Sequence, residues 1–286
     1  FSTGKSVELE WMDPCLYQGD KPDIITALDG ISEASRYLHN RRLSDEVVED
    51  FFIQVLRKTK NKGIDVNLYN IVGMEMTGPE DWERWLAMLE RVNEKDFEGK
   101  KMRIKMTNTP FRPSPITPQA YAPVNLEYKK EFSSEAMRIL YDVEYSTQWN
   151  ENRVIKFFQR SPLESEASLL SDICVVRAGA KNSEKIFNLF AFNSKFRAMR
   201  RDEQYQFIRM NYDIWDLTRA YETSETLPTW FLESYIPNEV IKKIRAKTKE
   251  NLSKAWDTKT KRFINYDPYG PTTLDSMEPY SVELVA

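Results

Sequence analysis

The chain contains very little cysteine and histidine. Its 286 residues include two cysteines, Cys15 and Cys174, and one histidine, His39. The cysteines are far apart and form no CxxC or CxxxCxxC spacing, so this chain alone supplies the ligands of neither a zinc site nor an iron–sulfur site. One histidine leaves little room for Ser–His or Cys–His catalysis, and we expect His39 to be structural or solvent-facing. Two isolated cysteines fit a reducing, cytoplasmic setting.

Long hydrophobic runs and a strong net charge are also missing. No run approaches the roughly 18 apolar residues that a membrane-spanning helix needs, and no signal peptide is visible, so we expect no membrane partner. The net charge of −3 and the pI near 5.6 do not by themselves indicate nucleic-acid binding, although a local basic patch stays open. Because the first residue is Phe1, we expect a processed product or one piece of a longer polypeptide.

Three short runs predict buried strands. They lie at residues 23–28, 64–72 and 101–106 and are rich in apolar and β-branched side chains. Helical patterns separate them, and strands that alternate with helices of this length favour a parallel sheet. The predicted fold class is therefore α/β, which does not by itself name a function.

Helix start signals lie between these strands. A short helical stretch is expected over residues 33–38, and Ser44, followed by two acids, predicts the start of a longer helix that ends at Gly63. Residues 77–81 are a further start, with a proline in the first turn. The apolar stripe of that helix is expected to belong to the core and comprises Trp82, Trp85, Leu86, Leu89 and Val92.

Proline marks the predicted domain boundary. Five prolines between residues 107 and 123 indicate an extended segment. We therefore predict an extended lead-in over 1–22, an α/β part over 23–123, a mainly helical domain over 124–265 and an irregular tail over 266–286. Helical stripes in the third part are Ala167, Leu170, Ile173 and Cys174; Ile186, Leu189 and Phe190; Phe207, Met210 and Ile214; and Val240, Ile241 and Ile244.

Residues 27–36 read ALDGISEASR and residues 38–46 read LHNRRLSDE. This region resembles the fourth strand of radical S-adenosylmethionine (radical SAM) enzymes. In that family the strand ends in an acidic-small-Ser stretch, and an Asn-Lys-type pair and a helix starting at Ser or Thr follow. The resemblance implies that Asp29 lies near the ribose or amino-acid part of SAM, with Ser32 as its small polar neighbour.

Residues 68–82 read LYNIVGMEMTGPEDW and are similar to the fifth strand of the same family and the helix after it. The resemblance implies that Ile71 contacts the adenine of SAM and that Gly73 lies beside it. The acid that ends the family motif is out of register, because Glu75 is present but Met76 occupies the matching position. Any role of Glu75 therefore stays open.

Residues 109–118 read TPFRPSPITP and are similar to the proline-rich segment after the sixth strand in several radical SAM subgroups. The resemblance implies that residues 23–123 form the carboxyl-terminal half of a partial (β/α) barrel, with this loop near the substrate mouth. The mainly helical domain that follows resembles nothing we can name.

The chain departs from the family in its missing CxxxCxxC loop. In radical SAM enzymes that loop holds three irons of a cluster whose fourth iron chelates SAM. The resemblance therefore implies SAM as a cofactor, and an iron–sulfur cluster only where its ligands come from outside this chain. The partner is then another chain or a missing amino-terminal part, and no catalytic residue is assigned.

A plain structural role competes with each of these assignments. Asp29 either contacts a ligand or caps a loop, and Ser32 either binds or acts as the N-cap of the next helix. Arg36 more commonly forms a surface ion pair than a pair with a ligand carboxylate. Ile71 is either core or adenine contact, and Gly73 most simply gives the chain room to turn.

Three functions remain open from the sequence. The first is the carboxyl-terminal portion of a radical SAM enzyme. The second is a structural or interaction protein derived from such a fold. The third, weaker, is RNA binding through a cluster that we more readily interpret as a solvated helix face: Arg197, Arg200, Arg201 and Arg209, with Tyr205 and Phe207.

Overall fold

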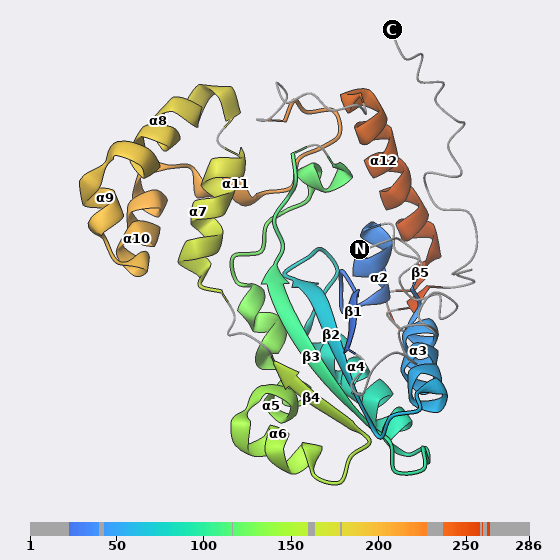
Figure 1. The fold of residues 1–286 in the computed structure, drawn as a ribbon. Helices are drawn as coiled ribbons and strands as arrows, with labels where there is room; N and C mark the ends of the chain where they lie inside the picture. The colour runs from blue at the N-terminus through green and yellow to red at the C-terminus, as the bar shows by residue number, and fades with distance from the viewer. Residues whose placement is uncertain are drawn as a thin grey trace, which may run out of the picture.

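A computed structural model describes residues 23–39, 43–115, 117–159, 164–177, 179–227, 237–257, 259 and 262–263. The predicted lead-in and tail lie outside these residues. In chain order the elements are β1 (Asp23–Ala27), α2 (Glu33–Leu38), α3 (Asp45–Lys58), β2 (Gly63–Val72), α4 (Pro79–Asn93), β3 (Lys101–Pro110), η1 (Pro118–Tyr121), η2 (Tyr128–Ser133), α5 (Glu135–Tyr141), α6 (Val143–Asn150), β4 (Ile155–Gln159), α7 (Glu166–Arg177), α8 (Gly179–Phe192), α9 (Ser194–Ala198), α10 (Arg201–Asn211), α11 (Ile214–Thr218), α12 (Asn238–Ala255), β5 (Trp256–Asp257) and β6 (Arg262–Phe263) (Figure 1).

Four strands form one parallel sheet in the sequential order β1-β2-β3-β4. Val66 in the second strand lies opposite Ile24 on one side and Ile104 on the other, and Ile104 lies opposite Phe157. Crossovers between parallel strands are almost always right-handed, so strands added in sequential order place their helices on the same face. The predicted α/β class with a parallel sheet is confirmed.

The predicted helix starts have the expected caps, but one helix ends early. The Ser44 hydroxyl accepts a hydrogen bond from the Val47 N–H at 3.3 Å, as an N-cap does. Helix α3 then ends at Lys58, because Thr59 adopts an extended conformation after its N–H bonds to the Val55 carbonyl. We expected Gly63 to end this helix, and that expectation is wrong. Gly63 is the first residue of β2.

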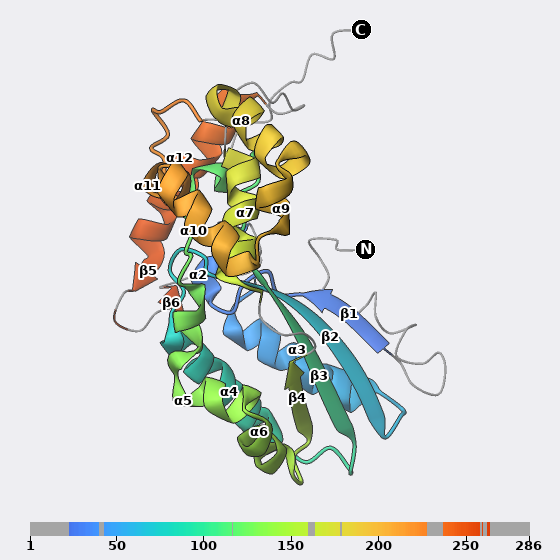
Figure 2. The ribbon, with the colours of Figure 1, turned by 90° about the vertical axis from the view of Figure 1, so that its left-hand side faces the viewer.

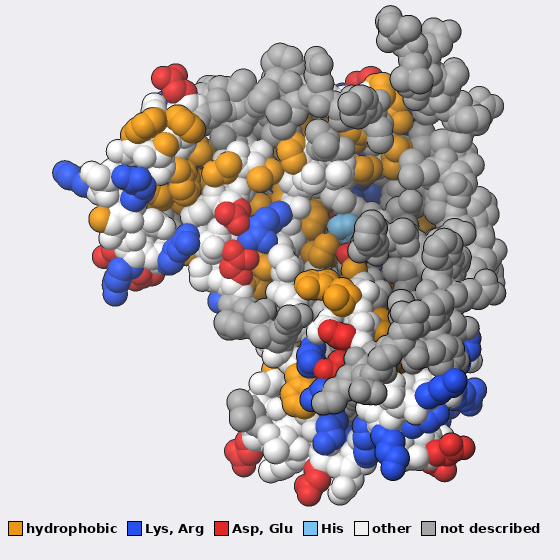
Figure 3. All heavy atoms as spheres, viewed as in Figure 1, with side chains coloured by type: hydrophobic (Ala, Val, Ile, Leu, Met, Phe, Trp, Pro, Cys, Tyr) orange, Lys and Arg blue, Asp and Glu red, His pale blue; other side chains and the backbone are white. Residues whose placement is uncertain are grey.

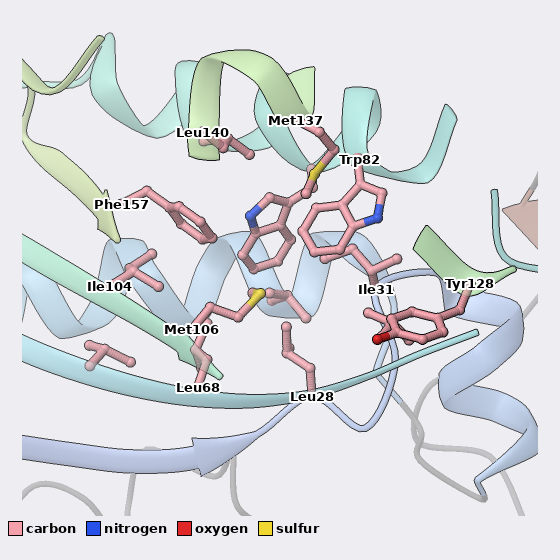
Figure 4. Packing of buried hydrophobic residues seen from close by; sticks show 14 of the residues in the cluster. Leu28, Ile31, Leu68, Trp82, Ile104, Met106, Tyr128, Met137, Leu140 and Phe157 are labelled. Atoms are coloured by element: carbon pink, nitrogen blue, oxygen red, sulfur yellow. The ribbon is translucent and has the colours of Figure 1, made fainter. Parts of the chain in front are cut away.

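The covered face of the sheet packs against the helical layer (Figure 4). Leu68 and Met106 point from the strands towards Trp82 on α4 and Met137 on α5. All four side chains are buried. Each fully buried apolar side chain contributes about 1.5–3 kcal/mol, so this layer is the main source of stability. The stripe predicted for α4 is confirmed as core.

None of the described helices covers the opposite face of the sheet. Ile25 in β1 is 67% exposed and Phe158 in β4 is 41% exposed, although both lie within the sheet. Between them, Asp65 accepts from Arg103 at 2.6 Å and from Lys105 at 2.7 Å. Figure 2 shows α4, α5 and α6 on one side of the strands, and no described helix lies against the other side. Parallel sheets are normally covered on both faces, so this exposure is unusual.

The sheet extends beyond the predicted boundary at residue 123. Strand β4 lies inside the segment that we expected to be mainly helical, and it pairs with β3. The side chain of Asn150, at the end of α6, donates to the Phe157 carbonyl at 3.1 Å and accepts from the Phe157 N–H at 2.8 Å. A five-residue apolar run is too short a pattern for sequence analysis to separate from a helix.

Helices α7 to α11 form a lobe beyond the carboxyl ends of the strands (Figure 1). The stripe predicted on α7 is buried, from Ala167 to Cys174. The stripe predicted through Phe207, Met210 and Ile214 is wrong. Ile208 is buried instead and Met210 is 84% exposed. The helix ends at Asn211, so Ile214 belongs to the next helix.

Candidate functional site

The residues singled out by the resemblance lie at the carboxyl-terminal edge of the sheet. Ala27 is paired with Tyr69, and the Leu28 N–H bonds to the Tyr69 carbonyl at 2.9 Å. Asp29 and Ile71 therefore follow at the same edge of two neighbouring strands. Asp29 is half-buried and has a left-handed backbone with φ of 57°. Ligands of open α/β sheets bind at this edge, so the position suits a site.

The hydroxyl of Ser32 is used within the protein. Ser32 is the N-cap of α2, and its Oγ accepts from the Ser35 N–H at 3.1 Å. The Ser35 hydroxyl in turn donates to the Ser32 carbonyl at 2.8 Å. Both side chains are buried. The capping interpretation of Ser32 therefore accounts for its contacts.

Gly73 lies close to other residues of the protein, so its lack of a side chain is explained by packing within the chain. Its φ is 78°, and a Cβ at this position would lie 2.7 Å from the Cβ of Tyr128. The Gly73 N–H donates to Oε1 of Glu131 at 2.9 Å. Only glycine combines this backbone with this contact. Gly73 therefore packs η2 against the end of β2.

Ile71 belongs to a small apolar cluster above the sheet edge. The half-buried side chain packs against a separate buried cluster made of Ala34, Leu38, Met74, Phe111 and Ala122. His39 lies beside this cluster, with Nε2 at 3.2 Å from the Met74 sulfur and its ring edge-on to Phe111. The five core members of the cluster are buried, so they form the apolar support of the half-buried Ile71.

Glu131 is a buried carboxyl that the sequence pattern did not reveal. Its Oε1 accepts from the Thr77 hydroxyl at 2.6 Å as well as from Gly73, while Oε2 is buried without a hydrogen bond. Burial, and to a lesser extent the negative charge of Asp81, raise the pKa of Glu131 to about 7. Its partners are more than fifty positions away along the chain, so no local signal marks it.

Arg36 is buried rather than part of a surface ion pair. Its guanidinium donates to the carbonyls of Leu43 at 2.6 Å and Ile31 at 2.9 Å, and it pairs with Asp45. The side chain is about 1% exposed. Arg36 therefore ties the turn after β1 to the start of α3, which leaves it no free face for a ligand carboxylate.

Helix α12 contributes a second buried arginine to this edge. Arg245 pairs with Glu75 and donates from Nη1 to the Gln119 amide oxygen at 3.2 Å. The Gln119 amide donates in turn to the Leu38 carbonyl. Glu75 therefore has a partner within the chain, although it is out of register with the family motif. The signal that could have found Arg245 is its place in the stripe of Ile241 and Thr248, both buried.

The end of β3 carries a partly exposed charge cluster. Arg112 donates to Asp172 at 2.8 Å and to Glu164 at 2.6 Å, and these carboxylates raise its pKa. The Tyr128 hydroxyl donates to the Glu164 carbonyl, and burial raises the pKa of Tyr128 to about 12. The cluster joins the proline-rich segment to α7, and its arginine is already neutralised.

The described residues do not fit an iron–sulfur cluster or another metal. They contain no group of three or more His, Cys, Asp or Glu side chains placed to hold a metal ion. Cys174 is buried in α7, and burial raises the pKa of its thiol to about 12, so a thiolate is disfavoured. Cys15 lies outside the described residues.

Comparisons with family models, with curated proteins and with solved structures gave no match for this chain. Over the described residues, no helix is both long enough and apolar enough to cross a membrane. The candidate site therefore rests on its own geometry. That geometry is a sheet edge at which Asp29 follows β1 and Ile71 lies near the end of β2, with an apolar cluster packed against Ile71 and buried arginines holding the surrounding loops.

Proposed function

We propose that this chain is the carboxyl-terminal portion of a radical SAM enzyme and contributes part of the SAM pocket. The cluster loop lies upstream in a longer polypeptide or in another chain. Asp29 faces the ribose or amino-acid part of SAM, and Ile71 with its apolar cluster faces the adenine. Ser32 and Gly73 support this edge of the sheet without touching SAM: Ser32 caps α2, and Gly73 packs against Tyr128.

One observation carries the proposal: the four strands form an all-parallel sheet, and no described helix covers one of its faces. Its four strands follow each other in order, their helices lie on one side, and Ile25 on the first strand remains largely exposed. Strand β1 is at the edge, where further parallel strands can add. A sheet of this kind suits half of a (β/α) barrel, in which its uncovered face points inward and strands from the upstream part complete the ring.

The test is SAM binding by isothermal titration calorimetry, with this chain and with the longer polypeptide that contains it. Asp29→Asn removes the charge but keeps the left-handed backbone, which asparagine tolerates. We expect it to weaken SAM binding about tenfold, which corresponds to about 1.4 kcal/mol. Asp65→Asn, at the opposite end of the sheet, is the matched control and should leave the affinity unchanged.

Two results would remove the enzymatic claim. One is an upstream reading frame, and partner chains, without a CxxxCxxC motif. The other is equal SAM affinity of Asp29→Asn and the parent chain. The claim would be supported directly if the longer polypeptide, after chemical reduction, cleaved SAM to 5′-deoxyadenosine.

A scaffold protein derived from such a fold is the second candidate. The contacts of Ser32 and Gly73 favour it, because the Ser32 hydroxyl is used as a helix cap and Gly73 packs against Tyr128. A scaffold predicts that the chain is stable and stoichiometric in an assembly that covers the face of the sheet opposite the helices. It also predicts no heat of SAM binding in any form of the protein.

A further inference from the structure

We propose that the groove between α8 and the α10–α11 corner binds single-stranded nucleic acid. The groove has a volume of about 600 Å³, and its lining includes Lys185 and Asn188 of α8, Asn193, and Phe207 and Asn211 of α10. Pockets of a few hundred Å³ hold ligands the size of a nucleotide. This site lies in the helical lobe, away from the sheet edge, so it does not depend on SAM binding (Figure 1).

The amide side chains of the groove are held in fixed orientations. Asn193 Oδ1 accepts from the Phe196 N–H at 2.9 Å, which leaves its NH2 group as a donor. Asn211 Nδ2 donates to the Phe207 carbonyl at 2.8 Å, which leaves its oxygen as an acceptor. A donor and an acceptor in one pocket match the edge of a nucleobase, which presents both.

Exposed aromatic rings occur on the two helices that border the groove, α8 and α11. Phe192 follows Lys185 by seven residues and Asn188 by four, so it lies on the same face of α8 as these lining residues. It is 70% exposed and packs edge-to-face with Phe187 at 5.6 Å between ring centroids. Trp215, two residues after the groove residue Asp213, is 73% exposed. Such rings are the surfaces on which unpaired bases stack.

The segment from α9 to the end of α10 is basic although the whole chain is acidic. Residues 194–211, from α9 to the end of α10, contain five Lys or Arg and two acidic side chains, a local charge of +3 in a chain of −3. Arg200 pairs with Asp202 at 3.1 Å and Arg209 lies over Tyr205, while the exposed Arg197 and Lys185 remain for phosphates. The carboxylate of Asp213 carries the opposite charge, but it accepts a hydrogen bond from the Asp216 N–H as the N-cap of α11. Figure 3 shows basic side chains around an apolar patch on this lobe.

This combination favours nucleic acid over a protein partner. Protein interfaces have an apolar centre and a polar rim. Here the lining itself is polar: three of its residues are asparagines, Lys185 is its cation, and exposed rings lie on the adjoining elements. A duplex presents no free ring faces, and its bases are not available to a pocket of this size, so the ligand is single-stranded.

The test is fluorescence anisotropy with labelled RNA and DNA homopolymers of about 20 nucleotides, in about 50 mM and about 200 mM salt. We expect saturable binding that weakens with salt. The double variant Phe192→Ala/Trp215→Ala should weaken it about tenfold or more. Lys185→Ala should lower the slope of log K against log salt by about 1.

Matched controls separate the groove from the rest of the surface. Phe158→Ala removes an exposed ring on the face of the sheet opposite the helices, and Lys129→Ala removes an exposed lysine of η2; both should bind like the parent chain. The proposal is overturned by no saturable binding in low salt, or by equal losses in groove and control variants. Equal affinity for duplex DNA or for polyglutamate would overturn it as well. All substitutions are on exposed side chains, and circular dichroism checks that each variant is folded.

Discussion

The guanidinium of Arg36 is part of the protein interior, although a charged side chain close to a helix cap suggests a surface position. It gives hydrogen bonds to three carbonyls and an ion pair to Asp45. Removing one partner of a buried charge network costs more than the network contributes, because the remaining groups stay buried and unpaired.

We therefore predict that Arg36→Met lowers the free energy of unfolding by about 3–5 kcal/mol. Urea denaturation followed by circular dichroism measures it. Arg103→Met is the matched control, since Arg103 forms a half-exposed ion pair with Asp65 and should cost about 0–1 kcal/mol. Similar midpoints for the two variants would contradict the structural role of Arg36.

Glu131 makes the stability of the protein depend on pH. Its pKa is about 7 in the folded protein and 4.5 in an unfolded chain, so the folded state holds the proton more tightly. This contribution to stability is present below about pH 4.5 and is lost as the pH rises through 7. The loss is on the order of 2–3 kcal/mol.

Glu131→Gln keeps the oxygen that accepts from Gly73 and Thr77 but does not titrate. We expect its unfolding free energy to vary less between pH 5 and pH 8 than that of the parent chain, by on the order of 2 kcal/mol. Urea denaturation at several pH values in this window measures both. Parallel curves for the two proteins would show that Glu131 does not cause the dependence.

At the scale of elements, the turn from β2 to α4 depends on one glycine. Gly73 and Gly99 have nearly the same backbone, with φ of 78° and 77°, but only Gly73 has a neighbour within contact distance of an added Cβ. The two positions therefore separate backbone strain from steric clash.

We predict that Gly99→Ala lowers stability by about 1 kcal/mol and that Gly73→Ala lowers it by about 1–3 kcal/mol more. Denaturation midpoints of the two variants give the difference. Equal losses would mean that η2 moves away from Gly73 at no cost, and that the position is free for another contact.

Most elements of the α/β part follow from local signals in the sequence. Caps such as Ser44 and apolar runs such as residues 64–72 need only neighbouring residues to be recognised. Strand β4 and the corner between α10 and α11 have weaker signals, because the apolar run of β4 is short and the helical pattern continues across the corner. The first is defined by its pairing with β3, and the second by a helix break at Tyr212.

At the scale of the whole molecule, one hydrophobic core joins the sheet to the helical lobe. A continuous cluster of buried side chains includes Ile24 in β1 and Leu217 in α11. Arg177 of α7 reinforces the connection, since it donates to the Leu217 carbonyl at 3.0 Å and to the Ala120 carbonyl at 2.9 Å. Burial lowers the pKa of this guanidinium to about 10.

We predict that the parent chain unfolds in a single cooperative transition and that Arg177→Met shifts the whole transition, by about 3 kcal/mol, without splitting it. Calorimetry and circular dichroism with coincident midpoints would support this. Separate transitions for the sheet and the lobe would instead support the boundary at residue 123 that composition suggests.

The sequence alone determined the α/β class, the parallel sheet and the core stripe of α4, because periodicity and caps are local. The resemblance to radical SAM enzymes added an expectation about the sheet edge. Tertiary structure decided which side chains meet there. It placed Glu131 against Gly73 and Arg245 against Glu75, and it brought Asn193 and Asn211 to one groove. Contacts between distant segments depend on packing, which no local pattern encodes.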